Sequence, residues 1–409
     1  MTQPDAHQDT RAEKLLVVVG IIVLGFNLRP AAVSVGPVLD ELTAGLGMSP
    51  TVAGVLTTLP VLAFALFGAL APGLARVIGV HRITLVALGA VVVGLGLRAR
   101  TDSVPLFLLL SLVALAGMAT ANVLLPSLVK LHFPGRVGLL TSIYTTSMAI
   151  GLTAASVLTV PIAHQFGGEG WRWGLFIWAL TALVAALPWV ALVRHDKKPE
   201  DAPHTIRLAD VARTRLGWAM AAFFGLQSMQ AYSIFGWFAQ VYRDAGFSAS
   251  TAGLLLGVIT AMSIPLSFWV PSKAARMQNQ SWLIIGLVAC YPVGYLGLIF
   301  APVAGAWVWA VFIGTAASVF PLVLTLIGLR ARTSAGTSAL SGFTQSVGYV
   351  IAAIGPFGVG VLYDVTGGWT VPLTVLLILA VPQLIAGLTV ARPSYIEDHL
   401  ARSARSRAD

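Results

Sequence analysis

Residues 49–56 read SPTVAGVL, and residues 248–255, at an offset of 199 positions, read SASTAGLL. The two segments share their first serine, an Ala-Gly pair and the aliphatic residues that follow it. Further pairs occur in the same order at offsets of 195 to 200: Gly25 and Gly225, Gly36 and Gly236, Pro126 and Pro321, Gly151 and Gly348, and Trp171 and Trp369. Self-similarity at a fixed period indicates an internal repeat, so the second half of the chain repeats the first in parallel.

The composition places both halves in a membrane. Of the 409 residues, 57% are hydrophobic and only 10% are charged, whereas soluble domains carry about 25% charged residues. Long apolar runs recur along the chain, which is typical of membrane-spanning helices rather than of the short alternating strands of a membrane barrel. We expect twelve spans, at residues 15–39, 51–75, 83–100, 104–130, 137–164, 172–193, 216–242, 250–271, 282–300, 303–329, 336–363 and 369–391.

A polar segment at about 195–215 separates the sixth predicted span from the seventh. It is rich in charged residues and proline, as solvated linkers are. We therefore predict an all-α membrane protein whose twelve transmembrane helices form two pseudo-symmetric bundles of six. The predicted parts are an N-terminal tail at 1–14, a first bundle at 15–194, the linker at 195–215, a second bundle at 216–392 and a C-terminal tail at 393–409.

The positive charges predict the orientation of the chain. With the N-terminus inside, 20 of the 25 Lys and Arg residues fall in inside segments, and the outside segments hold Arg98, Arg100, Arg172 and Arg243. Cytoplasmic loops carry such an excess, so we predict a multi-pass protein of the cytoplasmic membrane with both termini in the cytoplasm. The net charge of +9 is spread over many loops, so the expected partner is the lipid bilayer and no nucleic acid.

Two local motifs carry a family resemblance. The first span contains Asn27-Leu28-Arg29-Pro30 followed by Ser34, Gly36 and Pro37, and residues 71–76 read APGLAR, followed by Gly79. Two six-helix repeats related by an axis along the membrane normal are the major facilitator arrangement. The chain resembles the major facilitator superfamily over nearly its full length and, within it, the cyanate permease and 2-nitroimidazole transporter family.

This resemblance implies a secondary active or facilitative transporter that moves a small anion or a small polar nitrogen compound by alternating access. One position departs from the common pattern of the superfamily. The loop between the second and third spans usually carries an aspartate, and here Arg76 follows Leu74 and Ala75 at that place. The usual charge lock at the cytoplasmic gate is therefore absent or built differently.

Arg29 is the most informative single residue, because it lies in the middle of a span while the other Lys and Arg residues lie in loops or near helix ends. A central arginine costs roughly 2.5–3.5 kcal/mol on insertion scales, and no acidic residue lies within a span to neutralise it. An anionic or strongly dipolar ligand would supply the missing charge. The alternative is that backbone carbonyls freed near Pro30 bind the guanidinium.

Uncharged polar residues predict the rest of a central site. Corresponding positions of the two repeats, such as Tyr144 and Ser341, carry polar groups in both halves. Alternative roles remain open: glutamines can join helices, Ser341 can serve packing, and prolines are tolerated in membrane helices without any role in gating. The predicted substrate-binding residues are Arg29, Asn27, Asn122, Tyr144, Gln227, Gln230, Tyr232, Ser341 and Gln345, and the predicted gating residues are Pro30, Pro37 and Arg76.

Other classes of function find less support in the sequence. No His/Cys/Asp cluster has the spacing of a metal site, and there is no Walker loop for ATP, so we expect no metal and no cofactor. One alternative is an exporter of lipophilic drugs, which usually has a membrane carboxylate. A less favoured alternative is an integral-membrane enzyme, which needs clustered acids, histidines or a nucleophile with its base. We expect a protein that acts on a small-molecule substrate as a monomer.

Overall fold

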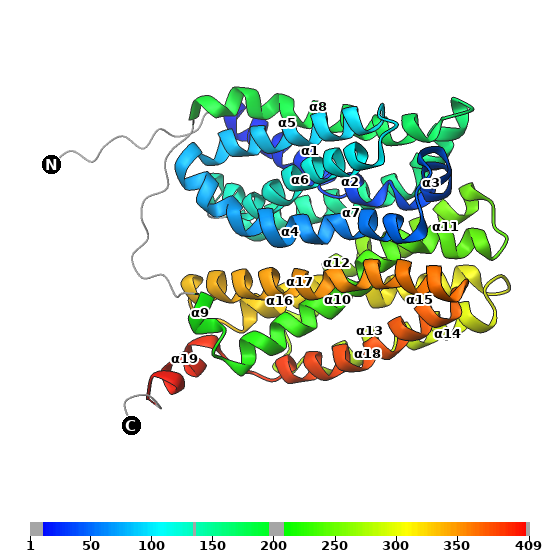
Figure 1. The fold of residues 1–409 in the computed structure, drawn as a ribbon. Coiled ribbons are helices and arrows are strands. Elements are labelled where there is room, and N and C mark those ends of the chain that lie inside the picture. Colours follow the sequence, from blue (N-terminus) through cyan, green and yellow to red (C-terminus); the bar gives the residue numbers. More distant parts are fainter. Residues whose placement is uncertain (1–10, 134–135, 196–207, 406–409) are drawn as a thin grey trace.

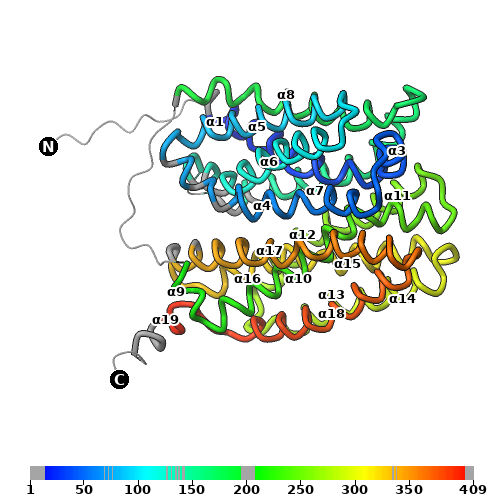
Figure 2. Tube along the Cα trace, in the orientation of Figure 1, coloured from blue at the N-terminus to red at the C-terminus, as the bar shows by residue number. Residues whose placement is uncertain are grey.

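The computed structural model describes residues 11–133, 136–195 and 208–405, which form helices and short connections. Figure 1 and Figure 2 show the helices side by side in two groups, one from each half of the chain. The short helix α9 (Leu208–Val211) and α19 (Ile396–Arg405) lie at one end of the bundle, and α3 (Leu39–Leu46) lies at the other. We call these ends the terminal end and the α3 end.

The first predicted span is divided into several short helices, whereas the five that follow it are single helices. The elements of the first half are α1 (Arg11–Asn27), α2 (Pro30–Val33), the 3-10 helix η1 (Gly36–Val38), α3, α4 (Pro50–Ile78), α5 (Val80–Arg98), α6 (Val104–His132), α7 (Val137–Gln165), α8 (Trp171–Leu192) and the 3-10 helix η3 (Val193–His195).

In the second half, three of the predicted spans consist of two helices in succession. After α9 the elements are α10 (Arg215–Asp244), α11 (Ala249–Ala261), α12 (Ser263–Ala275), α13 (Ser281–Val288), α14 (Cys290–Phe300), α15 (Ala306–Ala317), α16 (Val319–Leu329), α17 (Ser334–Thr366), α18 (Thr370–Ala391) and α19. The eighth span is α11 with α12, the ninth is α13 with α14, and the tenth is α15 with α16.

Within the described residues, eleven helical segments are long and apolar enough to cross a membrane. The seventh predicted span is the remaining one, and it is the single helix α10. Its 30 residues reach roughly 45 Å at 1.5 Å per residue, which is long enough to cross a membrane. It is less apolar than the other spans, because it contains several buried amide and hydroxyl side chains, among them Gln227, Gln230 and Gln240. Together these helices confirm the predicted all-α membrane fold in two bundles of six.

The two serines that begin the repeated octapeptides are helix caps. Ser49 starts α4 and Ser248 starts α11, and each hydroxyl accepts a hydrogen bond from the backbone N–H three residues on, at 3.3 and 3.2 Å. A capping hydroxyl satisfies one of the free N–H groups of the first helical turn. The repeat therefore fixes the starting point of corresponding helices in the two halves.

The glycines of the same octapeptides bring the two halves together. A Cβ atom added to Gly54 of α4 would lie 3.5 Å from the Cα of Gly360 in α17. A Cβ atom added to Gly253 of α11 would lie 3.0 Å from the carbonyl oxygen of Ser156 in α7. Both contacts join a helix of the first half to a helix of the second, near the α3 end. Small residues allow such close approach of membrane helices.

A second pair of glycines allows close packing of two helices within each half. A Cβ atom added to Gly25 would lie 2.9 Å from the Tyr144 carbonyl oxygen, which packs α1 closely on α7. A Cβ atom added to Gly225 would lie 2.9 Å from the Gly348 carbonyl oxygen, which packs α10 closely on α17. The first span therefore meets the fifth as the seventh meets the eleventh, in agreement with the offsets of the repeat.

The predicted end of the second span at residue 75 is too early, because α4 continues through Arg76 to Ile78. The helix ends only at Gly79, whose φ of 102° is unfavourable for other residue types and suits a glycine. The predicted linker lies outside the described residues over 196–207, and α9 lies within its remainder. The predicted C-terminal tail contains α19, whose residue Glu397 accepts hydrogen bonds from the backbone at the start of α17.

Candidate functional site

The first predicted span is interrupted at Arg29. Helix α1 ends at Asn27, and α2 begins at Pro30. The proline ring clashes with the preceding helical turn and disfavours helical backbone in the residue before it, so Arg29 has φ −126° and ψ −32° as the cap of α2. The sequence motif thus places one arginine between two helical segments in the middle of a membrane span.

Arg29 is buried and only partly satisfied. The residue is 8% exposed, and its Nη1 atom has no hydrogen-bond partner. The guanidinium carbon lies 5.4 Å from the centroid of the Phe64 ring, which is a cation–π distance. Among the residues that the structure describes, no carboxylate forms an ion pair with Arg29. A buried N–H group of this kind favours binding of an acceptor, and a positive group favours an anion.

Aromatic residues of both halves surround this guanidinium. The ring of Phe64 in α4 stacks on that of Tyr349 in α17, with centroids 5.1 Å apart, and lies 6.4 Å from that of Tyr232 in α10. Both tyrosines lie within electrostatic reach of Arg29. We call these four residues, Arg29, Phe64, Tyr232 and Tyr349, the Arg29 cluster. The cluster joins the two halves of the protein and offers planar faces beside a positive charge.

Two members of the cluster were not predicted from the sequence. Tyr349 lies four residues after Gln345, so helical spacing places it on the same face of α17 as the predicted Ser341 and Gln345, and this signal could have found it. Phe64 lies in an apolar stretch of α4 where an aromatic residue is indistinguishable from ordinary core.

The amides of Asn27 and Gln227 join helices within each half. Asn27 donates to the carbonyl oxygens of Val23 and Thr181, at 2.8 and 3.2 Å, and accepts from the Thr181 hydroxyl at 2.7 Å. Gln227, at an offset of 200, accepts from the Gln383 amide at 2.6 Å. The first span is thus tied to the sixth as the seventh is tied to the twelfth, which favours the interhelical role that had been left open for glutamine.

Gln230 has the same kind of environment. Its amide nitrogen donates to the carbonyl oxygen of Leu376 in α18 at 2.8 Å, and its oxygen accepts from the Tyr295 hydroxyl in α14 at 2.5 Å. The side chain is fully buried within the second half. Of the three predicted residues of α10, the structure therefore brings Tyr232 to Arg29, while Gln227 and Gln230 are occupied elsewhere.

The remaining predicted lining residues are half-buried. They are Asn122 on α6, Tyr144 on α7, and Ser341 and Gln345 on α17. The Gln345 amide donates to the Ser341 hydroxyl at 2.8 Å. Helices α6 and α7 pack against α1, and α17 packs against α10, so all four residues lie on helices next to those that carry Arg29 and Tyr232.

The predicted gating prolines lie at the two interruptions of the first span. Pro30 begins α2, and Pro37 lies in η1, which packs against α10 of the second half. At the residue before Pro37, a Cβ atom added to Gly36 would lie 2.4 Å from the Phe235 carbonyl oxygen. Arg76 lies in the last helical turn of α4, and its side chain is outside the described part of the structure.

Polar contacts between the halves occur at the α3 end. Arg243 of α10 forms ion pairs with Asp40 and Glu41 of α3, with N–O distances of 3.1 and 2.8 Å. Nearby, the Thr51 hydroxyl of α4 donates to the Asp364 carboxylate of α17 at 2.6 Å. Each contact pairs a residue of the first half with one of the second, so these three side-chain pairs join the halves at the α3 end.

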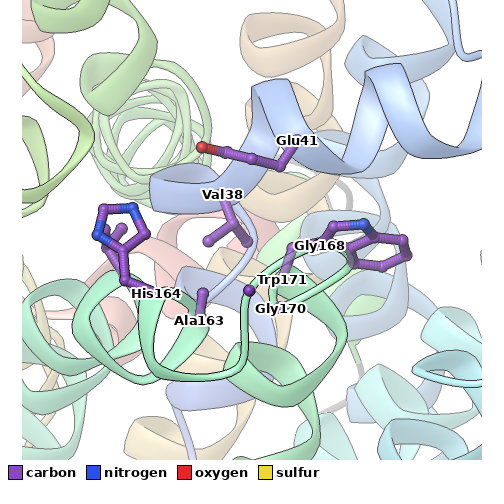
Figure 3. Close-up of a pocket in the computed structure, with 9 residues that line it drawn as sticks. Val38, Glu41, Ala163, His164, Gly168, Gly170 and Trp171 are labelled. Carbon is purple, nitrogen blue, oxygen red and sulfur yellow. The ribbon is translucent and has the colours of Figure 1, made fainter.

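A surface pocket of about 200 Å³ lies beside the ion pair of Arg243. Figure 3 shows the side chains of Glu41, His164 and Trp171 around it. Glu41 therefore belongs both to this pocket and to the contact between the halves. None of the lining residues belongs to the Arg29 cluster, so the pocket is a recess at the α3 end and separate from the buried arginine.

Arg98 lies near a helix end, as predicted, but this position does not expose its side chain. This residue ends α5, yet it is fully buried. Its guanidinium donates to the Ala31 carbonyl oxygen and to the Ser111 hydroxyl, each at 3.3 Å. Neighbouring helices cover the last turn of α5, so closeness to a helix end does not give exposure at this position.

Comparisons with known proteins agree with this architecture. Residues 15–356 match the family model described as Major Facilitator Superfamily. The chain is 36% identical over 96% of its length to the uncharacterized transporter YycB of Bacillus subtilis, of which it covers 97%. It is 31% identical over 94% of its length to the 2-nitroimidazole transporter of Escherichia coli, of which it covers 97%. It is 27% identical over 85% of its length to the cyanate transport protein CynX of the same organism, of which it covers 90%.

Solved structures share the fold at low sequence identity. A bacterial homolog of the human lysosomal transporter Spinster, in an inward-facing and occupied conformation, superposes with a TM-score of 0.75 at 15% identity, over 95% of this chain and 98% of that one. A D-xylose–proton symporter gives a TM-score of 0.71 at 14% identity, over 93% and 97% of the two chains. This chain therefore belongs to the Major Facilitator Superfamily and is a multi-pass membrane transporter, not an enzyme.

Proposed function

We propose that this transporter binds a small anion or a small polar nitrogen compound at Arg29 and moves it across the membrane by alternating access. The observation that carries the proposal is the buried Arg29 guanidinium, which has an unpartnered Nη1 atom and no ion-paired carboxylate among the described residues. Arg29 lies about 15 residues into the first span, or roughly 22 Å along a helix, near the middle of a hydrocarbon core about 30 Å thick. Facilitator sites lie near that depth, between the two halves.

The aromatic members of the cluster support a ligand that is small and flat. Phe64 and Tyr349 present stacked rings beside the guanidinium, and planar groups pack well on such rings. The planar fork of arginine can hold two acceptor atoms of one ligand at once. Relatives named for cyanate and for 2-nitroimidazole transport agree with a ligand that is small and carries negative charge or polar nitrogen.

The other predicted residues take different parts in this proposal. Tyr232 and Tyr349 add hydroxyl groups near the charge. Asn122, Tyr144, Ser341 and Gln345 line the ligand path on the helices next to the cluster. Asn27, Gln227 and Gln230 hold the first and seventh spans in place through the bonds described above, and so support the site without contacting the ligand.

Gating follows from the interruptions of the first span and from the contacts at the α3 end. We propose that the ion pairs of Arg243 with Asp40 and Glu41 keep the α3 end closed while the substrate exchanges at the terminal end. The breaks at Pro30 and Pro37 let α2 and α3 move with respect to α1. Arg76, at the other end of α4, would belong to the opposite gate.

A flux experiment tests this function. Purified protein in proteoliposomes is tested for uptake of radiolabelled cyanate, formate and 2-nitroimidazole, and for movement of the lipophilic dye ethidium, in the wild type and in Arg29→Gln. We expect the wild type to move at least one of the small polar probes and Arg29→Gln to lose that movement. Movement of ethidium alone, unchanged in Arg29→Gln, would instead support the lipophilic-drug exporter.

A further inference from the structure

Arg98 is a second buried arginine without a carboxylate partner. It is fully buried, and within the described part of the chain it forms no ion pair with a carboxylate. Its Nε atom has no hydrogen-bond partner, and its carbon Cζ lies 5.8 Å from the centroid of the Phe107 ring. A buried unpaired charge is expensive, and an apolar side chain of similar size would fill this space without that cost. The charge therefore needs an explanation other than packing.

The contacts of Arg98 lead to the segment that carries Arg29. The Nη2 group donates to the carbonyl oxygen of Ala31 in α2 at 3.3 Å. Helix α2 is a single turn of four residues, and the last carbonyls of a helix have no partner within it. The nearest backbone bonds of this turn run from Ala32 and Val33 back to the Arg29 carbonyl oxygen, at 3.0 and 3.1 Å. One side chain from the third span thus binds the short turn that begins at Arg29.

A corresponding contact exists in the second half. Tyr295 of α14, in the ninth span, donates to Gln230 of α10, in the seventh span. Arg98 and Tyr295 are 197 residues apart, and Ala31 and Gln230 are 199 residues apart, close to the offset of the repeat. In both halves a polar side chain of the third repeat helix binds the first repeat helix at the same level. In the first half the helix is broken there, and the side chain that binds it donates to a backbone carbonyl instead of to another side chain.

We infer that Arg98 is a positioning residue, which holds the α2 turn through Ala31 and thereby orients Arg29 toward the substrate. The inference rests on the proposed function of Arg29. The last-turn position in α5 suits this role, because the helix C-terminus favours a positive charge. The fixed charge of Arg98 also adds a second positive centre to the first half, next to the segment that receives an anion.

Two measurements on the purified full-length transporter test the inference. Hydrogen exchange of the backbone over residues 28–38 reports the stability of the α2 turn, and the concentration dependence of 2-nitroimidazole and cyanate uptake reports the site. In Arg98→Met we expect exchange of the Ala32 and Val33 amides at least about fivefold faster, because a charged hydrogen bond is lost. We expect the half-saturating concentration to rise at least about fivefold, while the maximal rate and the thermal stability stay close to those of the wild type.

Matched variants separate positioning from a general loss of structure. Ser111→Ala removes the other hydrogen-bond partner of Arg98 and should behave as the wild type in both measurements. Arg98→Lys keeps the charge and a single donor nitrogen without the planar fork, and should recover part of the affinity. Unchanged exchange over residues 28–38 in Arg98→Met would overturn the inference, as would faster exchange without any change in half-saturation. If the wild type transports neither probe, the proposed substrate class fails, and the exchange result alone decides whether Arg98 holds the turn.

Discussion

Arg29 combines two interactions of different strength. A hydrogen bond to a charged donor is worth about 1.5–3 kcal/mol, whereas a cation–π contact contributes from about 0.5 to about 2 kcal/mol, depending on burial. Within the protein, Phe64 supplies the cation–π contact, but no protein group accepts a hydrogen bond from Nη1. The hydrogen bond should therefore determine affinity for a ligand, and the aromatic rings should determine which shapes fit.

Replacing the Phe64 ring should alter selectivity more than it alters affinity for every ligand. Phe64→Leu keeps an apolar side chain but removes the stacking surface, which is worth about 0.5–1.5 kcal/mol. We expect the affinity for 2-nitroimidazole to fall by roughly three- to tenfold, and the affinity for the linear cyanate ion to change less. Competition binding on purified protein measures both.

The control for this prediction is Phe166→Leu. Phe166 is exposed near the α3 end and stacks on Trp173 with centroids 4.8 Å apart, so it loses a similar contact far from Arg29. Equal losses for the two ligands in Phe64→Leu, or equal losses in both variants, would argue against a stacking role for Phe64.

The residues of the site differ in how far the sequence could predict them. Arg29 could be found because a charge within an apolar run is rare and costly. Tyr232 and Gln227 are both polar residues of one helix, and the sequence does not tell which face of α10 meets the other half. Phe64 is chemically ordinary in a membrane helix and gives no signal. Arg98 was missed because the end of a helix is exposed only if its neighbours leave it uncovered.

Among the helices, the break in the first span separates a part that packs within the first half from a part that contacts the second half. Helix α1 stays packed on α7 and α8, partly through Gly25 and through the bonds between Asn27 and Thr181. The pieces that follow the break, η1 and α3, contact the second half through Gly36 and through the carboxylates that meet Arg243. The break therefore lies between α1, which packs within the first half, and the pieces that contact the second half at the α3 end.

Charge reversal at Arg243 should open the α3 end. Partly exposed ion pairs contribute at most about 1 kcal/mol each, so they can hold a gate that must also open. Arg243→Glu replaces attraction to Asp40 and Glu41 by repulsion. We expect the distance between spin labels at Ala44 and Gly368, one in each half, to shift toward longer values, with the open population increased by roughly fivefold or more.

Arg172→Glu is the matched control for the reversal at Arg243. Arg172 lies at the same end but bonds Asp102 and Glu169 of its own half, so its reversal should leave the distance between the labels unchanged. A distance distribution that responds equally to both reversals would show that the ion pairs of Arg243 have no special part in closure.

At the scale of the whole molecule, the repeat made the architecture predictable. Membrane helices must satisfy their own backbone hydrogen bonds, so long apolar runs could be assigned as spans, and the paired glycines showed that the halves are equivalent. Helix ends were harder to predict, because helix α4 extends past the apolar run to Gly79. Pro30 indicated an interruption of the first span. The contacts that the interrupted segment makes could not be predicted, because they depend on packing between segments distant in the sequence.

The predicted orientation can be tested by cysteine labelling in a Cys290→Ser background. Ala44 and Val303 are exposed residues at the α3 end, and both should react with an impermeant maleimide added outside the cell. These positions avoid Gly305, where an added Cβ atom would lie 2.4 Å from Trp309. A cysteine at Pro203, in the predicted linker, should react only after the membrane is permeabilised. Labelling of position 203 in intact cells would refute the assignment of cytoplasmic termini.

Direct contact between Arg29 and the substrate can be tested by calorimetric binding of 2-nitroimidazole and cyanate to purified wild type, Arg29→Lys and Arg29→Gln. Arg29→Lys keeps the charge without the planar fork, so it should bind more weakly. Arg29→Gln loses the charge and should bind at least about tenfold more weakly than the wild type, with thermal stability preserved, because removal of a buried unpaired charge relieves a cost. Wild-type affinity in Arg29→Gln would contradict direct contact between Arg29 and the substrate.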